Sequence, residues 1–138
     1  PYSTENEHIC YHWDHSKGKS IKGIQMVNFA YHEPEQSITL PVSFELIKKT
    51  EEYYDQKTQK VKRRSPISKN EIVRQRLYTL TKQNKVLYKY VLWDSWYSSK
   101  ENLAFVHQDL KKTFVAALQN NRTVALRKCF KTPTTYLT

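Results

Sequence analysis

A short apolar run that ends in a single acid is the feature of this sequence that most constrains its fold. Residues 88–93 read YKYVLW, an aromatic and branched segment typical of a β-strand buried on both faces of a sheet. Asp94 follows at once, and residues 98–101 (SSKE) form a capping box that predicts a helix start. Because a carboxylate is costly to ionise inside a core, we expect Asp94 at the carboxyl end of the strand, where open sheets place ligands and metal ions. A second reading, in which Asp94 only caps the following turn, is equally compatible with the spacing.

Length and charge limit the classes of protein to consider. The 138 residues suffice for one domain with a core, and 23 Lys and Arg against 13 Asp and Glu give a net charge of +10. Such an excess predicts a polyanionic partner, most often nucleic acid.

No apolar run approaches the roughly 20 residues that span a bilayer. Two cysteines, Cys10 and Cys129, match neither a disulfide framework nor a zinc site, which favours an intracellular, cytoplasmic setting. The start at Pro1 predicts a fragment or a processed product.

Hydrophobic periodicity predicts an α/β order of elements. We expect strands over residues 8–14, 21–31, 37–48, 88–93, 113–118 and 123–126, and helices over residues 68–84 and from residue 98 onward. The second and third strands should pair as an antiparallel hairpin, with Pro41 at an edge or a bulge. Residues 48–67, polar and basic in their second half, are predicted to be a mobile loop. An antiparallel set followed by strand–helix alternation indicates a mixed sheet.

Four blocks of the sequence resemble the DDE-type transposases of bacterial insertion sequences. They are WDHSKGKSIKG at residues 13–23, LPVSFELI at 40–47, YVLWDSWYSSKEN at 90–102 and FVAALQNNRTVAL at 114–126. The blocks occur in the order of that family and place its catalytic domain at residues 1–126, followed by a divergent tail at 127–138. The resemblance implies a ribonuclease-H-like mixed sheet flanked by helices, here lacking the first strand and the final helix. The chain would then be an internal fragment of a transposase.

The resemblance also implies metal-dependent chemistry at Asp94. The family uses an Asp-Asp-Glu triad, whose hard carboxylate oxygens hold Mg²⁺ or Mn²⁺ while DNA strands are cleaved and transferred in cut-and-paste transposition. Asp94 aligns with the second acid of the triad, as a catalytic and metal-binding residue, and the other two acids fall outside the matching blocks. Because one carboxylate cannot hold two cations, we expect this chain alone to be inactive.

Basic residues near the matching blocks are the candidate contacts to double-stranded DNA. They are His15, Lys17, Lys19, Lys22, Lys62, Arg63, Arg64 and Lys100. Each phosphate that such residues neutralise makes binding more salt-dependent, and the alternative for each is a solvated charge without a particular partner. The implied partners are transposon ends and target DNA, with a possible homodimer on paired ends and a place on the bacterial nucleoid.

Two other functions stay open from the sequence. One is a non-catalytic nucleic-acid-binding remnant, and the other is a ribonuclease-H-like nuclease unrelated to transposition. A zinc site at residues 12–15 (HWDH) is disfavoured, because a strand would turn His12 and Asp14 to one face and His15 to the other. Trp93 and Trp96, which flank Asp94, are expected in the core.

Overall fold

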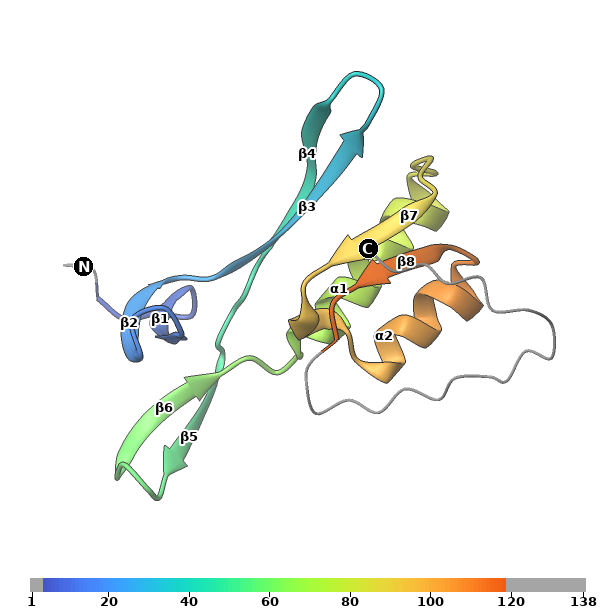
Figure 1. The fold of residues 1–138 in the computed structure, drawn as a ribbon. Coiled ribbons are helices and arrows are strands. Elements are labelled where there is room, and N and C mark those ends of the chain that lie inside the picture. Colours follow the sequence, from blue (N-terminus) through green and yellow to red (C-terminus); the bar gives the residue numbers. More distant parts are fainter. Residues whose placement is uncertain (1–3, 119–138) are drawn as a thin grey trace. The chain divides into compact units, whose positions relative to one another are not determined.

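The computed structural model describes residues 4–118, in two compact units that meet in the sequence between Tyr88 and Lys89 (Figure 1). The elements of the first unit are β1 (Ile9–Asp14), β2 (Lys19–Ile24), β3 (Met26–Glu33), β4 (Ile38–Leu46), β5 (Glu51–Asp55), β6 (Lys60–Arg64), α1 (Lys69–Tyr78) and the wider helical turn η1 (Thr79–Gln83). Those of the second are β7 (Tyr90–Trp93), the 3₁₀ turn η2 (Ser95–Tyr97), α2 (Lys100–Ala104), its wider continuation η3 (Phe105–Asp109) and β8 (Thr113–Ala116).

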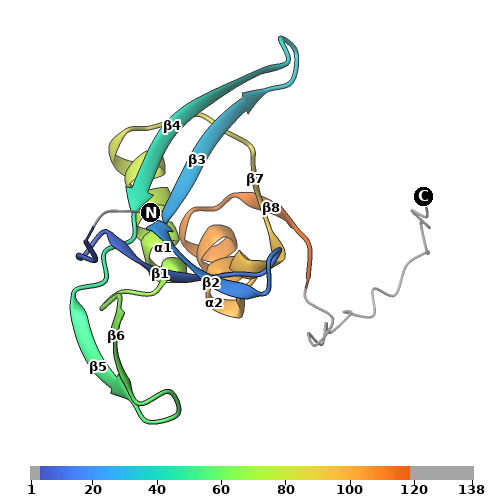
Figure 2. The ribbon, with the colours of Figure 1, turned by 90° about the vertical axis from the view of Figure 1, so that its left-hand side faces the viewer.

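The strands pair two by two. Among the described residues β1–β2, β3–β4 and β5–β6 are antiparallel pairs and β7–β8 is a parallel pair, each a separate two-stranded sheet (Figures 1 and 2). The predicted α/β class is therefore confirmed, whereas the strands of this part of the chain do not join into one continuous mixed sheet. The strand predicted at residues 123–126, the tail at 127–138 and Cys129 lie outside the described residues.

The hairpin β3–β4 has the pairing and the irregularity that the sequence predicts. The register shifts between Phe29, which faces Ser43, and Ala30, which faces Pro41, so that Val42 is the extra residue of a β-bulge. Proline has no N–H to give to the ladder, and a bulge beside it removes the need for one. The prediction of a bulge at Pro41 is confirmed.

One predicted strand is in fact two. Residues 21–31 were expected to be continuous, but β2 ends at Ile24 and β3 begins at Met26. β2 pairs back with β1 across a turn in which Gly18 has φ +59°, while β3 pairs forward with β4. Between them the Gln25 carbonyl accepts the N–H of Ile47 at 2.8 Å. The spacing of apolar residues shows which residues can be buried. It does not show where one strand ends and the next begins when the pairing partner changes.

The segment at residues 48–67, predicted to be a basic loop, contains the hairpin β5–β6 instead. Its strands are joined by ion pairs between β5 carboxylates and β6 cations: Glu51–Arg64 at 2.9 Å, Glu52–Arg63 at 2.8 Å, and Asp55–Lys62. Opposite charges that face each other across two strands stabilise the pairing. The polar residues that suggested a loop are thus the ones that pair in charge across the two strands.

Helix α1 begins and buries its side chains as predicted. The Ser68 side-chain oxygen caps the helix by accepting the N–H of Glu71 at 3.1 Å. Val73, Leu77 and Leu80, the three apolar residues at helical spacing, are all buried. They form one buried face along α1 and η1.

The second unit is a parallel strand–helix–strand crossover. Tyr90 to Trp93 of β7 face Thr113 to Ala116 of β8 in register, and Val106 and Leu110 of the intervening segment are buried. The expectation that β7 is buried on both faces is wrong within this unit. Val91 is 8% exposed, but Leu92 is 73% exposed, because successive side chains of a strand point to opposite faces and here only one is covered.

Candidate active site

Asp94 lies where the sequence predicts, at the carboxyl end of a parallel strand. It is the first residue after β7, its side chain is exposed, and its backbone is extended at φ −70° and ψ 159°. Its carbonyl accepts the N–H of Tyr97 at 3.0 Å, which closes the turn η2. The carboxylate makes no capping bond to that turn, and its Oδ1 accepts the hydroxyl of Ser95 at 3.0 Å. The backbone of Asp94 therefore forms the turn and leaves the carboxylate facing solvent.

Two buried polar residues hold the segment that follows Asp94. The Ser98 hydroxyl donates to the carbonyl of Ala117, just after β8, at 2.7 Å. The Asn102 side-chain amide is fully buried and donates from Nδ2 to the carbonyl of Tyr97 at 2.8 Å. A buried polar group is favourable only when it is hydrogen-bonded, so both bonds fix the loop. The Ser98 bond ties the loop after β7 to the end of β8, and the Asn102 bond holds the loop itself beside Asp94.

The register of the helix start differs by one residue from the prediction. Ser99, not Ser98, caps α2 by accepting the N–H of Asn102 at 3.2 Å. Sequence reasoning missed the roles of Ser98 and Asn102. The available signal was the pair of adjacent serines, since only one of them can be the cap and the other is free to bond elsewhere.

Asp94 also affects its neighbour electrostatically. Burial raises the pKa of the Tyr97 hydroxyl, and the negative charge of Asp94 raises it further. Lys100, a predicted DNA contact, is exposed at the first position of α2. The second unit thus brings Asp94 and Lys100 into one short segment.

The two tryptophans that flank Asp94 differ in burial. Trp93 is half-buried, and its Nε1 is buried with no acceptor among the described residues. Trp96 is 58% exposed, so the prediction that it lies in the core is wrong. It falls within the 3₁₀ turn η2, outside β7.

The described residues do not complete a metal centre. Nowhere in residues 4–118 do three or more His, Cys, Asp or Glu side chains gather in a way that could hold an ion. Ions such as Mg²⁺ need several oxygen ligands in a fixed geometry. Asp94 supplies one carboxylate, and no group of three or more such side chains forms around it within the described residues.

His12 and Asp14, the polar residues at and just before the first matching block, form hydrogen bonds in the β1–β2 hairpin. His12 Nε2 lies 3.2 Å from the Gly23 carbonyl oxygen, and burial, with the charge of Lys49, lowers the pKa of this imidazole. Asp14 accepts the N–H of Ser16 at 3.0 Å and its hydroxyl at 2.6 Å. Both side chains therefore have partners within or beside the hairpin.

The predicted DNA contacts of the first unit fall on two hairpins. His15 and Lys17 lie in the β1–β2 turn, and Lys19 and Lys22 lie on β2. Lys17 Nζ is 3.9 Å from an Asp14 oxygen.

The second basic group lies on β6. It consists of Lys62, Arg63 and Arg64, and each is paired with a β5 carboxylate. A phosphate that bound these three cations would have to compete with those pairs. Exposed pairs of this kind contribute little energy and exchange readily.

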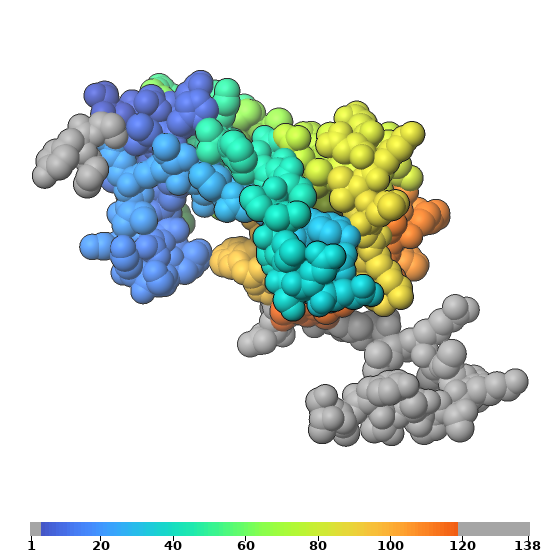
Figure 3. Space-filling model, turned by 90° about the horizontal axis from the view of Figure 1, so that it is seen from above, coloured from blue at the N-terminus to red at the C-terminus, as the bar shows by residue number. Residues whose placement is uncertain are grey.

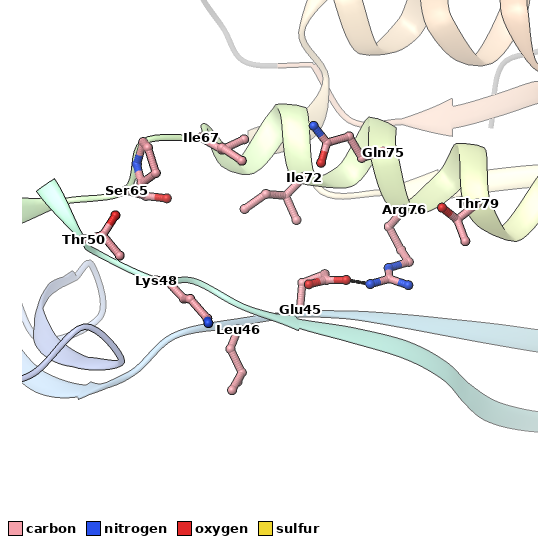
Figure 4. Close-up of a pocket in the computed structure, with 11 residues that line it drawn as sticks. Glu45, Leu46, Lys48, Thr50, Ser65, Ile67, Ile72, Gln75, Arg76 and Thr79 are labelled. Atoms are coloured by element: carbon pink, nitrogen blue, oxygen red, sulfur yellow. Dashed lines mark ion pairs between the residues drawn. The ribbon is translucent and has the colours of Figure 1, made fainter.

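A cleft of about 410 Å³ in the first unit lies between the end of β4 and one side of α1, from Ile67 before the helix to Thr79 after it (Figure 4). Glu45 is the one acid among its lining residues, and it forms an ion pair with Arg76. The cleft therefore offers no unpaired carboxylate for a metal ion.

Comparison with known families agrees with the resemblance of the four blocks. The sequence profile of the DDE superfamily endonucleases matches residues 7–136, and the chain belongs to this family. No curated protein and no solved structure matches the chain. DDE superfamily endonucleases act on DNA and generally use divalent metal ions. None of the helices in the described range is long and apolar enough to cross a membrane.

Proposed function

We propose that this chain is part of the catalytic domain of a DNA transposase and that Asp94 is one of the carboxylates that hold its divalent ions. The proposal rests on where Asp94 lies in the fold of this chain, which belongs to the DDE superfamily. Its exposed carboxylate stands at the end of parallel strand β7, on a loop tied to the end of β8 by Ser98. The carboxyl ends of parallel strands are where sheets of this kind bind ligands.

In the complete enzyme such carboxylates would hold Mg²⁺ or Mn²⁺, which neutralises developing charge and activates the attacking oxygen during strand cleavage and transfer. Asp94 contributes a ligand whose backbone is fixed by the η2 turn and whose Oδ1 is oriented by the Ser95 hydroxyl. A ligand held on a rigid strand end loses little entropy when an ion binds. Cut-and-paste transposition of an insertion sequence is the reaction we infer.

The chain on its own is proposed to be inactive. Catalysis at phosphorus needs a fixed set of ligands, and no group of three or more ligand side chains forms among the described residues. The test is incubation of the purified chain with a duplex in Mg²⁺ or Mn²⁺, followed by denaturing electrophoresis. We expect no cleavage. Mg²⁺-dependent cleavage that disappears in Asp94→Ala would show that the chain carries a complete site.

Contact to duplex DNA is proposed for the basic residues of both units. Lys19 and Lys100 are exposed, and the positive charge of the whole chain favours a phosphate backbone. Transposon ends and target DNA are the proposed duplexes, with a homodimer on paired ends and a place on the nucleoid. A non-catalytic DNA-binding remnant is the second candidate, and the incomplete metal centre of residues 4–118 is the observation that favours it.

A further inference from the structure

The β1–β2 hairpin has two faces of different character. Residues directly opposite in an antiparallel pair share a face, and the register sets Tyr11 against Lys22 and Trp13 against Ser20. The opposite face of the hairpin carries Cys10, which is 1% exposed. Figure 3 shows the surface of this hairpin in blue. One face of the hairpin is therefore turned inward near Cys10, and the face of Tyr11 and Trp13 is open.

The open face combines aromatic rings with positive charge. Tyr11 is 56% exposed and Trp13 is 57% exposed, although large aromatic side chains usually gain free energy by burial. Lys22 stands opposite Tyr11. The Lys49 ammonium donates to the backbone carbonyl of Tyr11 at 2.6 Å, and its charge acts on Cys10 and His12, whose side chains belong to the opposite face. The His15 ring contacts the Trp13 ring edge-on, with centroids 6.4 Å apart.

We propose that this face, defined by Tyr11 and Trp13 with Lys22 beside them, binds the unpaired bases of a single DNA strand. Aromatic rings flanked by cations are how proteins bind single strands, since every base has a π-face and every phosphate a charge. In a duplex the base faces are stacked on one another, so these rings would have nothing to stack on. The two side chains lie on one face about 7 Å apart along β1, which lets successive nucleotides contact one ring each.

Charge complementarity argues against a protein ligand as the occupant. The hairpin at residues 9–24 carries three lysines against one acid, Asp14, and that acid is engaged by the turn residue Ser16. A polyanion fits this balance, and an ordinary apolar protein surface offers no charge to match it. The proposal rests on the proposed function only in naming DNA as the strand.

The test compares single-stranded with duplex binding. Fluorescence anisotropy of a labelled oligothymidylate and of a labelled duplex is measured at low salt in EDTA, for the unaltered chain and for Trp13→Ala. We expect the substitution to weaken single-strand binding about tenfold and to change duplex binding less than about twofold, because stacking on one base is lost and the charges are kept. Tyr11→Ala should act in the same direction.

Two further variants keep the result interpretable. Phe44→Ala removes a similarly exposed ring, 63% accessible, from the separate β3–β4 hairpin and should leave single-strand affinity unchanged. Trp13→Phe keeps a ring and should restore most of the affinity. Equal losses in Phe44→Ala, or unchanged affinity in Trp13→Ala that is folded by circular dichroism, would overturn the proposal. EDTA removes divalent ions from the assay, so this result is independent of whether Asp94 binds metal.

Discussion

At the scale of single residues, two buried polar side chains, Ser98 and Asn102, hold the loop that follows Asp94. Asp94 was placed at a strand end because an apolar run and a helix signal flank it, and both signals are local. The Ser98 bond reaches Ala117, 19 residues away, and leaves no spacing pattern. The Asn102 bond reaches Tyr97, five residues back, and depends on the path of the loop between them, which the sequence does not show. Buried polar residues that bridge loops are visible only once the fold is known.

Asn102 gives the first prediction at this scale. Asn102→Ala would leave the Tyr97 carbonyl without its 2.8 Å donor and would lower the free energy of unfolding by about 1–3 kcal/mol. Chemical denaturation, followed by tryptophan fluorescence or circular dichroism, measures the change. Gln108→Ala, an exposed amide in the same unit, is the matched control and should change it by less than about 0.5 kcal/mol. Equal stability of the two variants would contradict the supporting role of Asn102.

At the scale of elements, helix caps and apolar spacing predicted the helices correctly. The β5–β6 hairpin was predicted to be a loop because its residues are mostly charged. Ser68 and the buried face of Val73 and Leu77 could be predicted because each depends on residues within one or two turns. The hairpin β5–β6 could not, since it is joined by Glu51–Arg64 and similar pairs and lacks the alternation that marks a half-buried strand.

The pH dependence of this hairpin is the prediction at the element scale. The hydrogen bond from Lys62, followed by that from Thr58, lowers the pKa of Asp55 to about 2, against 3.8 for a free side chain. A carboxylate with a depressed pKa in the folded state stabilises it above the unfolded value. That contribution is lost as the pH falls from about 4 through about 2. Amide hydrogen exchange of β5 and β6 should therefore accelerate, relative to other strands, over this window.

Asp55→Asn is the matched variant for that measurement. It keeps the shape of the side chain and removes its charge, so exchange in β5 and β6 should be faster at neutral pH and should not accelerate further between about pH 4 and 2. If the unaltered hairpin and Asp55→Asn respond to acid alike, the Asp55–Lys62 pair does not hold these strands together.

At the scale of the whole molecule, family membership and the metal site depend on different evidence. Four matching blocks and the profile match over residues 7–136 establish a DDE superfamily endonuclease. A metal site requires acids from several elements to meet, and no group of three or more His, Cys, Asp or Glu side chains meets within residues 4–118. The spacing of residues in one sequence does not show which distant carboxylates meet in the fold. The sequence could therefore predict only one member of the site, Asp94.

The most direct test of the account is whether Asp94 binds a divalent ion. Mn²⁺ broadens NMR signals near its binding site, and a lone carboxylate on a fixed strand end should bind it weakly. We expect millimolar Mn²⁺ to broaden the amide signals around Asp94, and Asp94→Asn to abolish this effect. Asp109→Asn, which alters another exposed acid of the same unit, should not. Broadening that centres elsewhere, or that persists in Asp94→Asn, would contradict the assignment of Asp94 as a metal ligand.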